Sequence, residues 1–266
     1  MKTRIFVLFF LLLSAFTFSQ KKEGTEQITY FIKNNISNQK IIDSIFLKNR
    51  KNERLLRLLI KKSKDNSYLE GEFYGSNALG RYYRDLSLFD NSIYEYKNAL
   101  LVSRKKKDTI SEIKTLNAIG SVYRRQDDIR NALNYHQEAL DKATTIKNPK
   151  TTTKKSISIA QNSIGNIYLS LKQYELALKE FKKAMVFQKQ LNHTRGIAIN
   201  YKCFGDAYEG LGDLDEALKN YHKSLNYNTQ INSTIGKVIC GYNIANVLIK
   251  QKKYNHNYSP SNASNL

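Results

Sequence analysis

The sequence predicts an all-α fold, a solenoid of antiparallel helix pairs, and this prediction rests on its composition and on an internal repeat. The chain has 266 residues but only 12 Gly and 2 Pro, whereas a turn-rich β fold needs such breakers at nearly every strand end. A pattern of about 40 residues recurs along the chain. The 41% hydrophobic content is too high for a wholly disordered chain, and 2 Cys exclude a disulfide-dense scaffold.

The first 19 residues have the pattern of a secretory signal peptide. A basic start precedes an apolar run over residues 5–13, and Thr17 and Ser19 put small hydroxylated residues at −3 and −1 of a cleavage site before Gln20. The apolar run is short for a membrane span, although an uncleaved anchor or a buried helix is the alternative. We therefore expect an exported protein, periplasmic or secreted, without a transmembrane helix in the mature chain.

Residues 24–65 do not follow the repeat that dominates the rest of the chain. Within them, residues 41–46 and 55–60 have the apolar spacing of amphipathic helices. A solenoid needs a terminal element that covers the apolar side of its first unit. Residues 24–65 are therefore predicted to form a helical N-terminal cap.

The repeat is clearest in a heptad of the form Asn-x-aliphatic-Gly-x-x-Tyr, which three segments share, a fourth keeps in part and a fifth weakens. Its small residue is Gly80, Gly120, Gly165, Gly205 and Ala245 in turn. The spacings are 40, 45, 40 and 40 residues. The five extra residues fall at residues 148–153, which we interpret as a loop insertion.

The agreement continues after each heptad, so the repeated unit is longer. Twelve and nineteen residues after each Gly the chain has a small side chain. Sixteen residues after it stands a large ring-containing residue, in turn Tyr96, His136, Phe181 and Tyr221. Small and large residues at helical spacing predict two packed helices per unit. The predicted units are residues 67–106, 107–147, 152–191 and 192–231, then a partial unit at 232–254 that ends in the turn residue Tyr254, and a disordered tail at 255–266.

These residues resemble the tetratricopeptide repeat family, whose aliphatic-Gly-x-x-Tyr and Ala-aromatic-Ala patterns recur over about residues 67–230. The chain departs from the family pattern in lacking the Pro that closes each repeat and in its 40-residue period, against roughly 34. The resemblance implies a right-handed α-α superhelix. A signal peptide followed by such an array also resembles the exported sensor region of Bacteroidetes-type histidine kinases and LuxR-like regulators. Those usually continue into a membrane helix and an output domain. Repeat five lacks the Ala-aromatic-Ala series of a second helix, so we favour a fragment of a longer protein over a last helix that acts as the cap.

The resemblance also implies where a ligand would bind, since the positions −3, +1 and +4 around each Gly line the family's concave groove. The predicted ligand-binding residues are Asn77, Arg81, Arg84, Asn117, Arg124, Asn162 and Asn166. Arg guanidinium groups and Asn amides suit a carboxylate or a peptide backbone. The alternative is that these side chains only solvate the groove, and that the partner binds an edge or the convex side.

Nothing in the sequence predicts an enzyme, a cofactor or a metal site. The four His have no ligand spacing, and His136 occupies an aromatic position of the repeat, as a packed core residue would. A phosphate-binding Gly-rich loop and a GxSxG motif are both missing. Cys203 and Cys240 are predicted to be buried free thiols, although export would permit a disulfide.

The predicted function is therefore that of an exported scaffold that binds an acidic protein or peptide. Such a scaffold would be the sensor or assembly module of a signalling system. The net charge of +20 invites a nucleic-acid hypothesis, but export leaves little opportunity for that contact. Two alternatives remain open: an envelope-assembly scaffold without a signalling role, and a cytoplasmic basic repeat protein that binds RNA.

Overall fold

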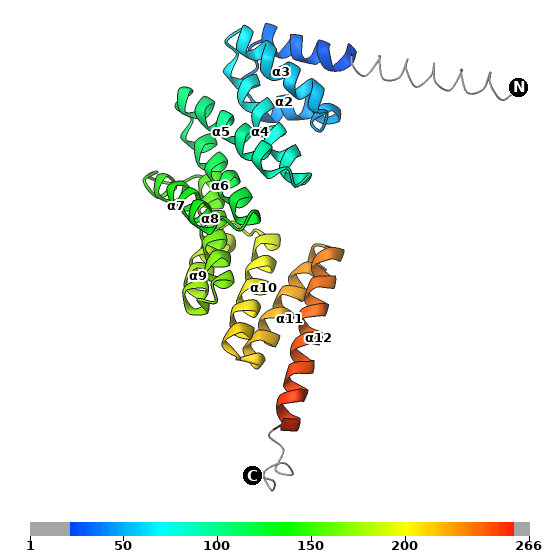
Figure 1. Ribbon diagram of the computed structural model, residues 1–266, viewed down its shortest axis with the longest axis vertical. Helices are drawn as coiled ribbons and strands as arrows, with labels where there is room; N and C mark the ends of the chain where they lie inside the picture. The colour runs from blue at the N-terminus through cyan, green and yellow to red at the C-terminus, as the bar shows by residue number, and fades with distance from the viewer. Residues whose placement is uncertain (1–21, 258–266) are drawn as a thin grey trace, which may run out of the picture. The chain divides into compact units, whose positions relative to one another are not determined.

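The computed structural model describes residues 22–257, and every regular element in that range is helical (Figure 1). The first helix covers residues 22–33 within the described part. The next elements are α2 (Gln39–Ile45), the 3₁₀ helix η1 (Leu47–Asn49), α3 (Glu53–Asp65), α4 (Leu69–Asp85), α5 (Phe89–Lys105) and α6 (Thr109–Arg125). They are followed by α7 (Ile129–Thr144), α8 (Thr151–Ser170), α9 (Tyr174–Gln190), α10 (Thr194–Leu211), α11 (Leu214–Gln230) and α12 (Thr234–Asn257). The signal peptide predicted at residues 1–19 lies outside the described residues.

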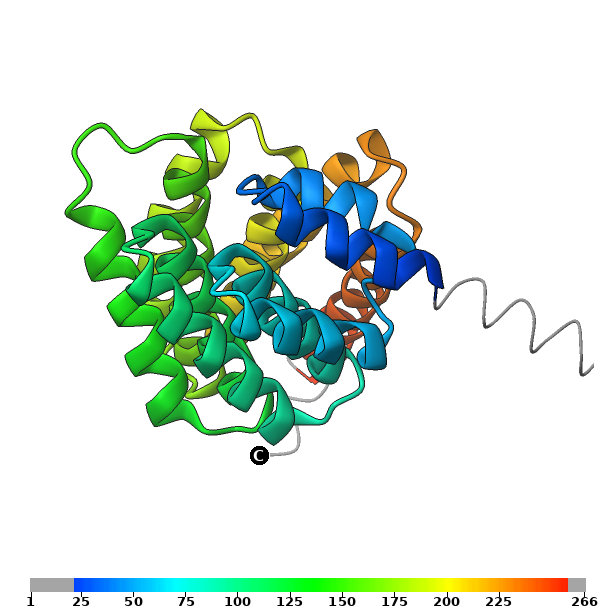
Figure 2. The same ribbon diagram turned by 90° about the horizontal axis from the view of Figure 1, so that it is seen from above.

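The chain divides into two compact units, Met1–Asp127 and Asp128–Leu266. Within each unit a helix returns alongside the one before it, and the closest contacts join neighbours such as α4 with α5 and α10 with α11 (Figures 1 and 2). The predicted units at 67–106, 152–191 and 192–231 each contain one helix pair, α4 with α5, α8 with α9 and α10 with α11. The predicted unit at 107–147 contains α6 and α7, which the division at Asp127 assigns to different compact units.

The segment predicted as a cap, residues 24–65, packs its apolar side chains against α4. Ile28, Phe31, Ile42 and Leu56 are fully buried and share a core with Leu79 of α4. The aromatic rings of this core meet edge to face, as Phe31 and Phe46 do with centroids 6.1 Å apart. Burial of each large apolar side chain stabilises the fold by about 1.5–3 kcal/mol.

The repeated Gly lets the two helices of a pair approach closely. A Cβ atom built on Gly205 would lie 2.5 Å from Cε1 of Tyr221, and one built on Gly165 would lie 2.5 Å from Cε1 of Phe181. Both aromatic rings are buried in the second helix of the pair, at the position sixteen residues after the Gly. The pattern of Gly and aromatic residue in the sequence is therefore a direct contact between helices.

The turns between helices share one backbone feature, a residue with positive φ. The turns within and between pairs place Ser67, Ser87, Lys107, Asp127, Asn148, Lys172, Asn192 and Asn232 in this left-handed region, with φ between 45° and 60°. Gly212, with φ of 84°, has the same role in the turn between α10 and α11. Among these turns, only the one between α10 and α11 has a Gly at this position, and Gly adopts positive φ without a steric penalty.

Two predicted boundaries are wrong. Helix α12 continues to Asn257, so Tyr254 is not a turn residue and residues 255–257 of the predicted disordered tail are helical. No Gly or Pro lies between Tyr254 and Asn257, so nothing there ends the helix. The insertion predicted as a loop at residues 148–153 is also partly helical, since α8 begins at Thr151. The remaining residues of the predicted tail, 258–266, lie outside the described part.

Helix α12 buries one face and exposes another that is apolar. Val247 and Cys240 are buried, and Val247 packs against Ala217 and Tyr221 of α11. Val238 is 67% exposed. The corresponding residues of α4, α6, α8 and α10 are Phe73, Ile113, Ser158 and Ala198, and none of them is more than 6% exposed. The second helix of the pair covers this position in α4, where Phe73 packs on Ala99 and Val102 of α5.

No helix within residues 22–257 combines the length and the apolar character that a membrane span requires.

Candidate functional site

The first unit contains a cavity of about 820 Å³ between α2, α4 and α6. Side chains from one face of α4 form the largest part of its lining, because Asn77, Arg81 and Arg84 are spaced at three or four residues and so lie on neighbouring turns. The turn after η1, Leu86 directly after α4 and Tyr96 of α5 complete the lining. The size is that of a typical ligand site, about 300–1,000 Å³.

The lining of this cavity is strongly cationic. Six basic side chains reach it, namely Lys40, Arg50, Lys51, Arg81, Arg84 and Lys114, against the two carboxylates Asp43 and Asp85. The guanidinium of Arg84 pairs with Asp85 at 2.8 Å, and Asp43 accepts a hydrogen bond of 3.0 Å from the Tyr74 hydroxyl. Among the described residues, the other five cations form no ion pair within 4.0 Å. An incoming anion would therefore meet five cations that are not engaged in an ion pair within 4.0 Å.

Aromatic rings form the apolar part of the lining. Tyr74 and Tyr96 are both buried, and burial raises the pKa of each phenol above its ordinary value. Arg81 lowers both pKa values, which shows that its charge lies near both rings. The cavity thus combines apolar surface with guanidinium and ammonium groups, as expected of a site for a ligand that has both apolar and anionic parts.

The structure brings together three of the seven predicted site residues, Asn77, Arg81 and Arg84, in this cavity. Asn117 does not reach it, because its side chain is buried in α6 at 5% exposure. Arg124 lies exposed near the end of α6, outside the lining. Asn162 and Asn166 belong to α8 in the second unit, where the Asn166 amide donates to the Asn162 carbonyl oxygen at 2.8 Å.

Sequence reasoning missed four of the cations, Lys40, Arg50, Lys51 and Lys114. Lys114 lies one turn before Asn117 on the same face of α6, so extending the pattern −3, +1, +4 to −6 would have found it. The other three belong to the segment outside the repeat, and no periodicity relates them to the repeated Gly.

Both cysteines are free and buried, in agreement with the prediction. Cys203 lies 3.8 Å from Oδ1 of Asn166, and Cys240 lies 3.2 Å from Oγ of Ser224. His136 is fully buried in α7 at the aromatic position of its repeat. Within residues 22–257, no three side chains of His, Cys, Asp or Glu gather as metal ligands would.

A family model described as tetratricopeptide repeat matches residues 74–145 and 156–230, more than half of the chain. The chain belongs to the tetratricopeptide repeat family. The two matched segments cover the helices from α4 to α11 almost completely. Repeats of this family are generally binding scaffolds rather than catalysts, because stacked helix pairs present extended surfaces. A sequence search of curated proteins finds no match.

Solved structures of other tetratricopeptide-repeat proteins have the same fold. BtubC (BKLC) from P. vanneervenii is 14% identical with a TM-score of 0.64, and the match covers 81% of this chain and 90% of that one. A Rap protein complexed with Competence and Sporulation Factor is 18% identical with a TM-score of 0.62, covering 88% and 73%. The apo form of RapI is 20% identical with a TM-score of 0.60, covering 88% and 72%. These similarities confirm the predicted fold class, an all-α tetratricopeptide-repeat solenoid.

Proposed function

We propose that this protein is an exported tetratricopeptide-repeat scaffold whose first unit binds an acidic peptide segment, and that it is the sensing or assembly module of a signalling system. The observation that carries the proposal is the cavity between α2, α4 and α6, with six basic side chains against two acidic ones. The ligand expected there has carboxylates next to an apolar or aromatic side chain.

The physical basis is complementarity of charge and of apolar surface. Arg81 offers a planar guanidinium that can hold a carboxylate through two parallel hydrogen bonds, and Lys114 adds a point charge from the neighbouring helix α6. One ligand side chain buried against Tyr74 and Tyr96 would add about 1.5–3 kcal/mol. Asn77 can hydrogen-bond a peptide backbone at the same place.

Export and signalling rest on other observations. The basic start, the apolar run at residues 5–13 and the small residues before Gln20 support export. Two proteins of similar fold support signalling. The Rap protein is solved in complex with Competence and Sporulation Factor. A signal-transduction ATPase from Pyrococcus horikoshii has a tetratricopeptide repeat sensor; it is 16% identical with a TM-score of 0.56, and the match covers 83% of this chain and 38% of that one.

The binding proposal is tested by selecting peptides from a displayed random library on the wild-type protein and measuring their affinities by calorimetry. The double variant R81A/K114A is expected to bind the selected acidic peptides about tenfold more weakly or worse, because two charged contacts are lost. R124A/R125A removes the same charge from exposed positions at the end of α6 outside the cavity, and should bind as wild type. Equal affinity of the two double variants, or selected peptides without acidic residues, would refute the site.

Export is tested by mass spectrometry of the mature protein from the native organism's cell fractions. The expected N-terminus is Gln20, in a chain recovered outside the cytoplasm. An intact Met1 on a cytoplasmic protein would contradict export and return attention to RNA as the partner. An RNA-binding assay on that protein would then decide between the two.

A further inference from the structure

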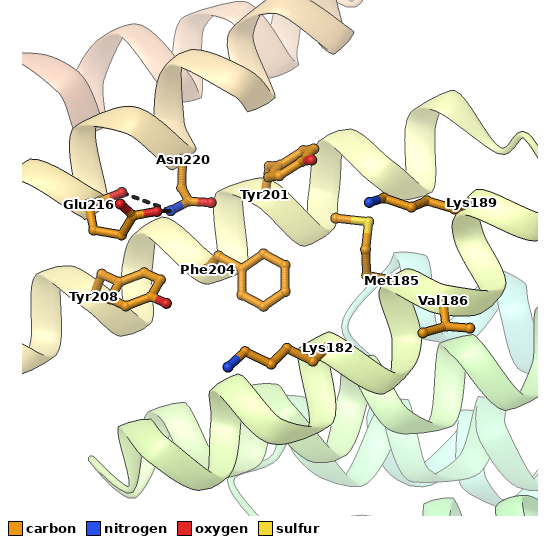
Figure 3. A pocket seen from close by; sticks show the side chains of 9 residues that line it. All are labelled: Lys182, Met185, Val186, Lys189, Tyr201, Phe204, Tyr208, Glu216 and Asn220. Atoms are coloured by element: carbon orange, nitrogen blue, oxygen red, sulfur yellow. Dashed lines mark hydrogen bonds between the residues drawn. The ribbon is translucent and has the colours of Figure 1, made fainter.

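The second unit contains another pocket, of about 370 Å³, formed by α9, α10 and α11 (Figure 3). Lys182, Val186 and Lys189 come from α9 and stand on one side of it, whereas Asn220 of α11 stands on the other. Phe204 of α10 lies between them. No residue of this pocket belongs to the cavity of the first unit.

The apolar part of the pocket is held in place by packing. The Phe204 ring meets the Phe181 ring edge to face, with centroids 6.1 Å apart, and Tyr201 stacks on Tyr227 at 5.6 Å. The Lys223 ammonium lies 5.4 Å from the centroid of the Tyr201 ring. A preorganised apolar surface of this kind can receive a large side chain without first having to rearrange.

Of the four lysines of α9, the two that line the pocket, Lys182 and Lys189, form no ion pair within 4.0 Å among the described residues. The described part of the second unit contains ion pairs such as Lys183 with Glu180 and Lys202 with Asp206, and neither Lys182 nor Lys189 takes part in any of them. Val186, between them on the same helix face, is exposed. Lys182, Val186 and Lys189 thus form a stripe with an apolar centre and a positive charge at each end.

The same positions of the first unit show what the protein does with such cations elsewhere. Lys97 of α5 corresponds to Lys182 and lies 6.0 Å from the centroid of the Tyr123 ring. Arg104 corresponds to Lys189 and binds Glu112 of α6 at 2.8 Å. The residue of α10 that corresponds to Glu112 is Ile197, so the second unit has no carboxylate there to neutralise Lys189.

Asn220 adds a hydrogen-bond acceptor with a fixed direction. It is 4% exposed, and its amide Nδ2 donates to the Glu216 carbonyl oxygen at 2.8 Å and to Glu216 Oε1 at 3.2 Å. These bonds turn Oδ1 toward the pocket (Figure 3). Oδ1 accepts no hydrogen bond from the residues that the structure describes, so it requires a donor from a ligand or from water.

We propose that this pocket is a second peptide site, which takes an extended segment with a large apolar residue between two acidic ones. The apolar side chain packs on Phe204 and Met185, the acidic residues meet Lys182 and Lys189, and a backbone N–H donates to Oδ1 of Asn220. Residues seven apart on a helix are separated by about 10 Å along its axis. Acidic residues three apart on an extended peptide span about the same distance. A peptide backbone offers Oδ1 of Asn220 an N–H donor, which a fatty acid cannot do, and this favours a peptide.

The probe is a fluorescein-labelled hexapeptide amide, Gly-Glu-Phe-Ser-Glu-Gly, titrated with the full chain at 0.15 M salt and followed by fluorescence anisotropy. Two matched peptides replace both Glu by Lys, or Phe by Ala. The probe is expected to bind at least about tenfold more tightly than either matched peptide. No binding of the probe, or equal binding of the probe and its Lys counterpart, would overturn the proposal.

Variants locate the binding. K182A/K189A should weaken binding of the probe about tenfold, whereas K179A/K183A removes the same charge from α9 outside the pocket and should have little effect. R81A/K114A in the first unit should leave binding of the probe unchanged. If R81A/K114A alone abolishes binding, the probe occupies the first unit; this pocket is then not the site, while the proposed function stands.

Discussion

At the residue scale, the repeated Gly is required by the ring that faces it and not by the helix that contains it. Gly in a helix interior is less favourable than Ala by about 1 kcal/mol. Position 205 nevertheless requires Gly, because a Cβ there would lie 2.5–2.9 Å from three atoms of the Tyr221 ring. Repeat five has Ala245 at the same position, where the side chain is exposed and no later helix of the described residues packs on it.

The first prediction compares two Gly→Ala substitutions. G205A should lower the free energy of unfolding by about 1–2 kcal/mol, because overpacking outweighs the gain in helix propensity. G241A in α12 should raise it by about 0.5–1 kcal/mol, since a Cβ there meets no atom within 4 Å. Denaturant unfolding followed by circular dichroism measures both values. Equal effects of the two substitutions would contradict the proposed role of the Gly.

The second prediction concerns Glu95, whose side chain is buried in α5. Burial raises the pKa of its carboxyl above the ordinary value of 4.5, although Arg57 lies 3.8 Å away. The charged form is therefore less favourable in the folded than in the unfolded protein, and this penalty is complete above the folded pKa and absent below the unfolded one.

E95Q should accordingly be more stable than wild type near pH 7, and the difference should shrink as the pH falls through the folded pKa and vanish below about 4. Thermal unfolding of both proteins across this pH range measures the difference. If E95Q is instead the less stable protein at pH 7, the attraction to Arg57 outweighs the burial of the charge.

At the scale of a single element, α12 has a buried face and an exposed apolar face. The third prediction is that V247A lowers the free energy of unfolding by about 1–3 kcal/mol, because Val247 is fully buried against α11. V238K should change it by less than about 0.5 kcal/mol, since Val238 is 67% exposed. Equilibrium unfolding in urea tests both. A large loss for V238K would mean that its side chain is covered in solution.

Elements also explain which part of the candidate site was predictable. Helical periodicity placed Asn77, Arg81 and Arg84 on one face of α4, and the structure finds them together in the cavity. The same rule failed for Asn117, which is buried although it has the same place in its repeat. The positions in the repeat fix a residue's direction on its own helix, but its exposure depends on which neighbouring helix covers it.

At the scale of the whole molecule, most contacts join helices that are adjacent in the sequence. Stability in such a protein is approximately a sum over neighbouring elements, so a local defect should remain local. The fourth prediction is that G205A, in α10, increases amide hydrogen exchange in α9–α12 but leaves α3–α5 close to wild type. Hydrogen exchange followed by mass spectrometry measures this for each helix. A uniform loss of protection would show that the chain unfolds as one cooperative body.

The fold was largely predictable from the sequence because the helices that contact one another are neighbours in the sequence. A 40-residue period, a Gly and an aromatic residue sixteen positions later were sufficient to predict helices α4 to α11 and the pairing of α4 with α5, α8 with α9 and α10 with α11. The two pockets were not predictable, since the first is lined by residues outside the repeat, such as Arg50, and the charge of the second depends on a departure from it, Ile197 in place of an acid.

The left-handed turn residues make the protein's stability adjustable at positions outside the lining of both pockets. Lys107 and Lys172 adopt positive φ although each has a Cβ atom, which costs about 1–2 kcal/mol per residue. Replacement by Gly removes this cost, but the greater conformational freedom of Gly in the unfolded chain offsets part of the gain in stability. K107G and K172G should therefore each raise the midpoint of thermal unfolding by a few degrees, without any change in peptide affinity. The protein is thus less stable than its fold permits. Substitutions in the turns alone should give a more thermostable form for crystallisation or biosensing.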